Sequence, residues 1–73
     1  MVIKINDEVR LSNDYVPQNR EEVKVYEDEA NGYVSDFHAQ DKGRVYVVFE
    51  GYGEDEGTDL GVWINKDLLD PII

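Results

Sequence analysis

The sequence contains no cysteine, so it can form no disulfide bond and offers no thiolate to a metal ion. Its apolar runs are all far shorter than the ~20 residues that a membrane-spanning helix needs. The first ten residues, MVIKINDEVR, carry acids where a signal peptide needs an apolar segment. We therefore expect a small soluble protein of the reducing cytoplasm that does not act on membranes.

Basic residues are also scarce: seven Lys and Arg face 17 Asp and Glu, which gives a net charge of −10. Proteins that bind nucleic acid directly use Lys and Arg to replace the counterions of the phosphates, and anionic membranes attract the same residues. The composition therefore argues against both partners. Highly acidic chains are often disordered, but 41% of these residues are hydrophobic and 11% are aromatic. We expect a folded domain whose acids serve either solubility or a basic partner.

Groups for catalysis are few as well. His38 is the single histidine, and we interpret it as a surface or partly buried residue with a hydrogen bond. Ser12 and Ser35 have no nearby pair of His and acid that would activate a nucleophile. The Gly51-Tyr52-Gly53 segment lacks the Lys and the following helix of a phosphate-binding loop. We therefore predict no enzyme, no catalytic residue and no cofactor.

One acidic segment is a candidate metal site. Residues 54–59, EDEGTD, place four carboxylates around Gly57, which superficially suits a hard cation such as Ca²⁺. The segment lacks the alternating acids and the flanking helices of an EF-hand. Weak cation binding is compatible with this pattern, but we predict no dedicated metal site.

The length of 73 residues predicts one domain over residues 1–73. In its first half, alternating apolar residues predict a strand from Val2 to Leu11 with a break or bulge near Asn6. Turn-forming residues and Pro17 then predict a long surface loop over 12–22. A short strand, Val23–Tyr26, would follow and end at an Asn31-Gly32 turn. A helix over 23–30 is the alternative, disfavoured by its β-branched residues and the early Asn-Gly stop.

The second half is organised around the segment from Arg44 to Ile64, which reads as a β-hairpin with a wide loop. Its strands are 44–50, with apolar residues on both faces, and 59–64; the Gly-rich loop 51–58 predicts an open, mobile tip. Around the hairpin we predict a bulged strand over 32–39, a turn over 40–43, a 3₁₀ or helical turn over 65–69 capped by Asn65, and a final strand at 72–73.

This order of elements resembles a Src-homology-3-like barrel. The residues that carry the resemblance are Glu8–Leu11, Gly32–Val34, Val45–Phe49, Leu60–Ile64 and the turn at 65–69. It implies an all-β fold, a small barrel of five or six strands with a 3₁₀ turn before the last strand. Signalling members of that group bind Pro-rich peptides through an aromatic groove, for which Tyr15, Tyr52 and Trp63 are candidates. Trp63, however, lies on the fourth strand and not at the start of the third.

The acids fall mainly into two clusters, 21–29 and 50–59. On a compact barrel they would form a band like the charge density of a duplex backbone, about one charge per 1.7 Å. In composition and size the chain resembles small acidic phage proteins that occupy the DNA-binding surfaces of host proteins. That resemblance implies a DNA mimic in the host cytoplasm, with a basic nucleic-acid-binding protein as its partner. The alternative is a generic Src-homology-3-like module that binds proteins or peptides without mimicry.

The residues that we expect to contact a partner are mostly acids: Glu27, Asp28, Glu29, Glu50, Tyr52, Glu54, Asp55, Glu56 and Asp59. The predicted strand Val23–Tyr26 would lie at an exposed sheet edge, and the final strand would be short. Both are compatible with a homodimer formed by strand pairing.

Overall fold

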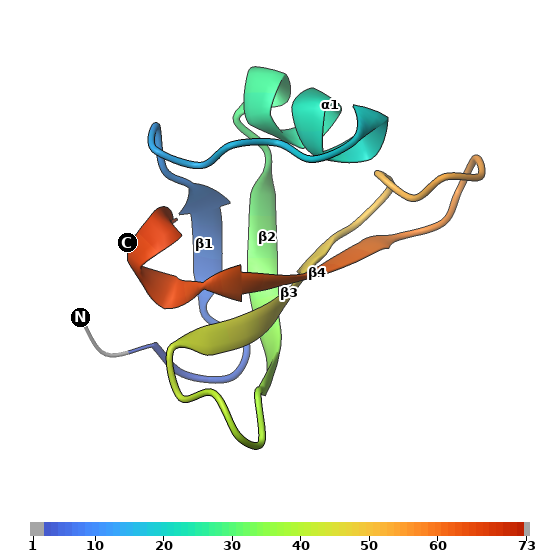
Figure 1. Ribbon diagram of the computed structural model, residues 1–73. Coiled ribbons are helices and arrows are strands. Elements are labelled where there is room, and N and C mark those ends of the chain that lie inside the picture. The colour runs from blue at the N-terminus through green and yellow to red at the C-terminus, as the bar shows by residue number, and fades with distance from the viewer. Residues whose placement is uncertain (1–2, 73) are drawn as a thin grey trace.

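The computed structural model describes residues 3–72 and consists of one five-stranded antiparallel sheet, one α-helix and one 3₁₀ turn (Figure 1). The strands are β1 (Glu8–Leu11), β2 (Asn31–Phe37), β3 (Arg44–Phe49), β4 (Leu60–Asn65) and β5 (Leu69–Pro71). The helix α1 (Arg20–Asp28) connects β1 to β2, and the 3₁₀ turn η1 (Lys66–Leu68) connects β4 to β5. No helix among residues 3–72 is long and apolar enough to cross a membrane.

The sheet has the strand order β4-β3-β2-β1-β5. Strands β2, β3 and β4 follow one another as antiparallel neighbours, and β5 returns to pair with the free side of β1. The sheet remains open, with β4 and β5 at its two edges. The prediction of an all-β chain therefore holds for the predominance of strands, but a helix is added and the strand order does not close.

The predicted hairpin is confirmed, with its strands at Arg44–Phe49 and Leu60–Asn65. Its register is continuous and places Tyr46 opposite Trp63. The predicted bulge in the preceding strand is confirmed too, because the β2–β3 register shifts between Val34 and Asp36. Asn65 caps the 3₁₀ turn as expected: its side-chain oxygen accepts the Asp67 N–H at 2.9 Å.

The loop predicted over 12–22 is confirmed up to Asn19, but the strand predicted at Val23–Tyr26 is wrong, since Arg20–Asp28 forms α1. A variant of the capping box starts this helix: the Asn19 side-chain oxygen accepts the Glu22 N–H at 2.9 Å. In return the Glu22 carboxylate accepts a hydrogen bond from Asn19 Nδ2 at 3.1 Å, in place of the Asn19 backbone N–H. Glu29 ends the helix in the left-handed conformation, with φ of 50°. The caps at both ends outweigh the low helix propensity of the β-branched residues. The proposed dimer edge at Val23–Tyr26 therefore does not exist.

The Asn31-Gly32 turn is also wrong, because the chain reverses at Glu29 and both residues lie in β2. Gly32 is buried under the core aromatic ring: a Cβ there would lie 2.7 Å from Cε1 of Phe49. Glycine is thus required for close packing and not for a turn.

The two terminal strands differ from their predicted bounds. The first strand begins at Glu8, because residues before it form a turn in which Asp7 N–H donates to the Lys4 carbonyl and Asn6 has φ of 73°. Val2, where the predicted strand began, lies outside the described residues. The last strand is Leu69–Pro71 and not 72–73; Ile73 also lies outside the described residues.

The core lies on one face of the sheet, where alternate residues of β3 are buried as the pattern predicted. Val25 brings α1 onto the same cluster, so the helix covers part of that core. On the opposite face of β3, Tyr46 and Val48 are only half-buried. The buried cluster consists of Val9, Leu11, Val25, Val34, Val45, Val47, Phe49, Ile64 and Leu69.

Candidate functional site

The loop between β3 and β4 is closed by hydrogen bonds, in contrast to the open tip that its glycines predicted. Gly53 N–H donates to the Thr58 carbonyl at 2.8 Å, and Thr58 N–H and Oγ1 donate to the Asp55 carbonyl at 3.1 and 2.6 Å. A Cβ on Gly53 would lie 2.0 Å from Thr58 Oγ1, so only glycine fits there. The exposed carboxylates of Glu54, Asp55 and Glu56 are consequently carried on an ordered loop.

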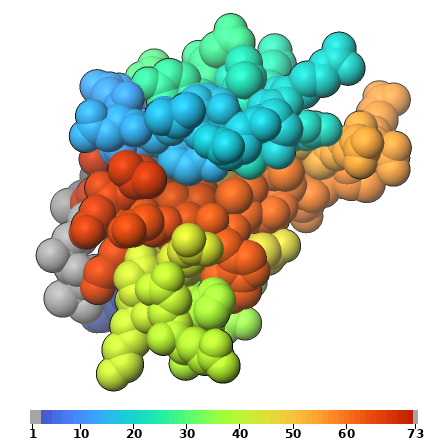
Figure 2. All heavy atoms as spheres, viewed as in Figure 1, coloured from blue at the N-terminus to red at the C-terminus, as the bar shows by residue number. Residues whose placement is uncertain are grey.

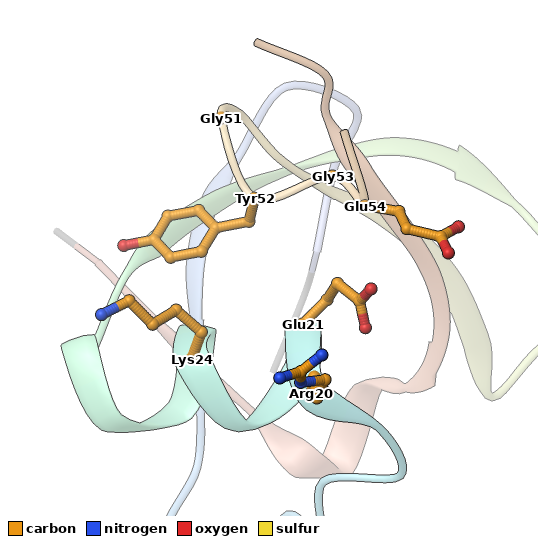
Figure 3. A pocket seen from close by; sticks show the side chains of 7 residues that line it. All are labelled: Arg20, Glu21, Lys24, Gly51, Tyr52, Gly53 and Glu54. Carbon is orange, nitrogen blue, oxygen red and sulfur yellow. The ribbon is translucent and has the colours of Figure 1, made fainter. Parts of the chain in front are cut away.

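A tyrosine joins this acidic loop to the helix. The Tyr52 hydroxyl donates to Asp28 Oδ2 at 2.8 Å, and Lys24 Nζ lies 3.8 Å from Asp28 Oδ1. In Figure 3 the Tyr52 ring lies above the Lys24 side chain, and both side chains point in the same direction. The hydrogen bond to Asp28, with smaller effects of desolvation and of the carboxylate charge, raises the pKa of the Tyr52 phenol above its ordinary value. The contact therefore holds a neutral phenol between loop and helix.

An open pocket of about 330 Å³ lies between the loop and α1. Figure 3 shows its lining: Arg20, Glu21, Lys24, Gly51, Tyr52, Gly53 and Glu54. Arg20, Lys24 and Asp28 are four residues apart along the helix, so they share the face that meets the loop. Sequence reasoning missed the two cations, because this four-residue spacing has meaning only once the segment is recognised as a helix. Two bases thus lie within the predicted acidic surface.

The acids around this pocket are largely uncompensated. Among residues 3–72 the structure shows two ion pairs, Lys24–Asp28 and Arg44–Asp41, and both are exposed. Of the eight acids predicted to contact a partner, only Asp28 takes part in one. All eight are exposed: Glu27, Asp28, Glu29, Glu50, Glu54, Asp55, Glu56 and Asp59. Unpaired charges of one sign that lie near one another, such as the loop acids Glu54, Asp55 and Glu56, generate a local potential.

The predicted residues are not all brought together. Tyr52 and Glu54 line the pocket, and Asp28 joins them through its hydrogen bond with Tyr52. The loop lies beside the start of α1 in Figure 2 as well. Glu50 instead lines a second pocket on the sheet, of about 460 Å³, with Asn6, Glu8, Asn31, Gly32 and Tyr33. Glu29 serves as the C-cap of α1. Asp59 links the two ends of the loop, because its Oδ1 accepts the Gly51 N–H at 3.1 Å.

Glu22, which the sequence placed in the acidic cluster, belongs to the interior. It is only 6% exposed, and its carboxylate accepts hydrogen bonds from the Tyr15 hydroxyl, the Gln18 N–H and Asn19 Nδ2. Burial raises the pKa of the Tyr15 phenol well above its ordinary value of about 10, and the hydrogen bond to Glu22 and the charge of its carboxylate raise it further. Glu22 is therefore unavailable to a partner.

The Tyr15 phenol gives the fold an alkaline sensitivity. The folded pKa lies above the unfolded value of about 10, so the unfolded chain loses this proton first and stability falls as pH rises past about 10. In the Tyr15→Phe variant this contribution is absent. We expect the difference in unfolding free energy between wild type and variant, measured with urea, to be constant from pH 7 to about 9 and to shrink above about 10. A difference that is the same at pH 8 and 11 would contradict the assignment.

His38 and Ser12, the other candidates for catalysis, form local structural contacts. His38 Nδ1 accepts the N–H groups of Gln40 and Asp41 at 3.2 and 2.9 Å, and its ring packs edge-on against Trp63 at 5.1 Å. Ser12 Oγ accepts the Asp14 N–H at 3.3 Å. Among residues 3–72 no three His, Asp or Glu side chains are grouped so that they could hold a metal ion.

The three aromatic candidates for a peptide groove make different contacts. Tyr15 bonds to buried Glu22, Tyr52 bonds to Asp28, and Trp63 packs against Tyr46 at 5.0 Å and against His38. Trp63, on the outer sheet face, is 43% exposed. The contacts of these residues do not join them into one aromatic groove.

No protein-family model matches the chain, and no curated protein or solved structure gives a significant match.

Loss of the tyrosine contact is expected to loosen the acidic loop. In the Tyr52→Phe variant the ring stays but its hydrogen bond of about 1 kcal/mol is lost, so we expect amide exchange at residues 53–58 to accelerate about fivefold. Hydrogen exchange followed by NMR measures this directly. Tyr33→Phe is the matched control, because the structure shows no hydrogen bond from the Tyr33 hydroxyl within residues 3–72. Equal exchange rates in the two variants would contradict the role of Tyr52.

Proposed function

We propose that this chain is a non-enzymatic, acidic protein-binding domain that occupies the basic nucleic-acid-binding surface of another protein. The observation that carries the proposal is the Tyr52–Asp28 hydrogen bond at 2.8 Å, which fixes the acidic loop against the acidic helix. Carboxylates from two segments distant in sequence thereby form one surface on an ordered frame. A preorganised surface loses less conformational entropy when a partner binds.

The amount of charge suits mimicry of a duplex. The molecule measures 31 × 23 × 23 Å, and at about 1.7 Å per charge a duplex of the same length carries about 18 charges. The chain has 17 acids. One of these acids, Glu22, is buried, and the net charge is −10. A protein that binds DNA by its charge would therefore meet fewer anions here than on the duplex, but still a dense set of them. The domain differs from a duplex in its few basic residues, and two of them, Arg20 and Lys24, line the pocket.

We also propose that the sheet is a variant of the Src-homology-3-like barrel. Support comes from the order of elements: a long first connection, the meander β2-β3-β4, the 3₁₀ turn η1, and β5 returning beside β1. The long first connection holds α1 in this chain. This architecture is shared by proteins with many activities, so it does not decide the function.

A second candidate is a generic interaction module whose contacts are apolar. The exposed ring of Trp63, packed against Tyr46 and His38, is the observation that favours it. We favour the acidic surface because it joins two segments of the chain through the Tyr52–Asp28 hydrogen bond.

Capture of partners from a cell lysate on the immobilised domain tests the proposal. A basic nucleic-acid-binding protein should be retained at about 0.05 M salt and released at about 0.5 M, because the contact is made by exposed charges. A module that uses Trp63 should instead retain its partner at both concentrations. Retention that is unaffected by salt would overturn the electrostatic proposal.

A further inference from the structure

The two edges of the sheet are protected to different degrees. The edge strand β5 has three residues and includes Asp70 and Pro71, which both discourage pairing with another strand. The edge strand β4 is twice as long, and its sequence LGVWIN has no charged residue and no proline. Its register with β3 is continuous, so no bulge twists it away. In a chain of which 33% is charged, β4 is an edge without protection.

The pairing of β3 with β4 shows which backbone groups face outward. Lys66 N–H donates to the Gly43 carbonyl at 2.7 Å, one step beyond the Arg44–Asn65 pair. Hydrogen-bonded pairs alternate along an antiparallel ladder, so Val62 and Ile64 bond to β3. The N–H and C=O groups of Gly61 and Trp63 therefore point away from it. No turn or loop within residues 3–72 bonds to them.

We propose that the β4 edge pairs with β4 of a second copy of this chain, antiparallel and about a two-fold axis at Val62. In this register Gly61 of each copy lies opposite Trp63 of the other, and Asp59 lies opposite Asn65. The Gly61–Trp63 pairs on the two sides of the axis present outward backbone groups to one another and form the hydrogen-bonded part of the ladder, which ends where Asn65 caps η1. The Tyr46 ring of the same copy covers Gly61, because a Cβ there would lie 2.8 Å from Tyr46 Cε2. The opposing indole, which is 43% exposed in the single chain, would therefore pack against that ring.

Charge complementarity supports a second copy as the occupant. The segment before β4 is acidic, with Glu54, Asp55, Glu56 and Asp59, whereas Lys66 follows the strand. An antiparallel arrangement places Lys66 of each copy beside the Thr58–Asp59 end of the other, and the two-fold axis forms this contact twice. The net charge of −10 on each copy opposes association, but at 0.15 M salt charges beyond about 8 Å are screened.

Cysteine cross-linking tests the register, because the chain has no cysteine of its own. Val62 would face its own copy at a non-hydrogen-bonded position, with Cα atoms about 4.5 Å apart, a distance that a disulfide spans. Under a glutathione buffer, Val62→Cys should form linked dimers at least about tenfold faster than Asp70→Cys on β5, because pairing raises the effective thiol concentration. Equal rates would overturn the proposal, as would a dimer in sedimentation that Val62→Cys does not cross-link.

Amide exchange in the wild-type chain provides a second readout that does not depend on a variant. Val62 and Ile64 amides should be protected at every concentration, whereas Gly61 and Trp63 amides should gain protection as the concentration rises. Protection of those two amides that does not change with concentration, in a chain that sediments as a monomer, would overturn the proposal. The same holds if their protection appears only after addition of a cell lysate, since the edge would then serve another protein.

Discussion

Replacement of Glu22 by alanine is expected to destabilise the fold by about 2–4 kcal/mol. The Glu22 side chain is buried, and its carboxylate accepts hydrogen bonds from the Tyr15 hydroxyl, from Gln18 N–H at 3.1 Å and from Asn19 Nδ2 at 3.1 Å. Alanine would leave these three donors without their acceptor and would remove half of the capping box of α1. A chain of this size has a small stability margin, so a loss of this magnitude unfolds a measurable fraction.

Urea unfolding measures the loss, and the neighbouring residue offers a matched control. Glu21→Ala changes the net charge by the same amount on the same helix, but the structure shows no hydrogen bond or ion pair of the Glu21 side chain within residues 3–72. We expect it to change the unfolding free energy by no more than about 0.5 kcal/mol. Glu22→Gln should lie between the two, because the amide keeps one acceptor oxygen. Equal losses in Glu21→Ala and Glu22→Ala would show that Glu22 acts only through its charge.

Neutralising the loop is expected to weaken partner binding by about tenfold or more. The variant Glu54→Gln, Asp55→Asn, Glu56→Gln changes three exposed carboxylates to amides of nearly the same shape. The backbone bonds that close the loop remain, among them those to the Asp55 carbonyl. We therefore expect the thermal unfolding midpoint to be at least that of the wild type, since mutual repulsion is reduced. Titration calorimetry with a partner captured from lysate measures the affinity.

The control for this variant separates position from total charge. Asp36→Asn, Asp67→Asn, Asp70→Asn makes the same change in net charge, from −10 to −7, at exposed positions outside the loop. If the loop is the contact, the control should bind within about twofold of the wild type, because a distant exposed charge is largely screened. Equal weakening in both variants would mean that only the overall charge matters.

The hairpin, the bulge and the Asn65 cap were predictable because each depends on residues close together in sequence. The β3 segment alternates buried and half-buried residues from Val45 to Phe49, and a strand follows from that pattern alone. The helix was missed for a local reason as well. The Asn-x-x-Glu pattern of Asn19 and Glu22 indicates the start of a helix, whereas the β-branched residues after it and the Asn31-Gly32 pair favour a strand and a turn.

The sequence predicts which residue types the site contains, but it does not predict which of them contact one another. The exposed loop acids followed from a Gly-rich, acidic segment between two strands. The burial of Glu22, by contrast, depends on Tyr15 folding back onto α1. The Tyr52–Asp28 contact joins residues 24 positions apart, and no short-range pattern indicates such a contact. The cations Arg20 and Lys24 entered the site for the same reason, because the loop packs along their face of the helix.

Competition with DNA tests the central claim most directly. A partner is first captured on the immobilised domain, and short duplex DNA is then added at constant salt. If the acidic surface occupies the nucleic-acid-binding face of the partner, the duplex should displace the partner fully, and the released protein should carry the DNA. If the DNA instead binds while the partner stays on the domain, the two surfaces are separate and the domain does not act as a DNA mimic.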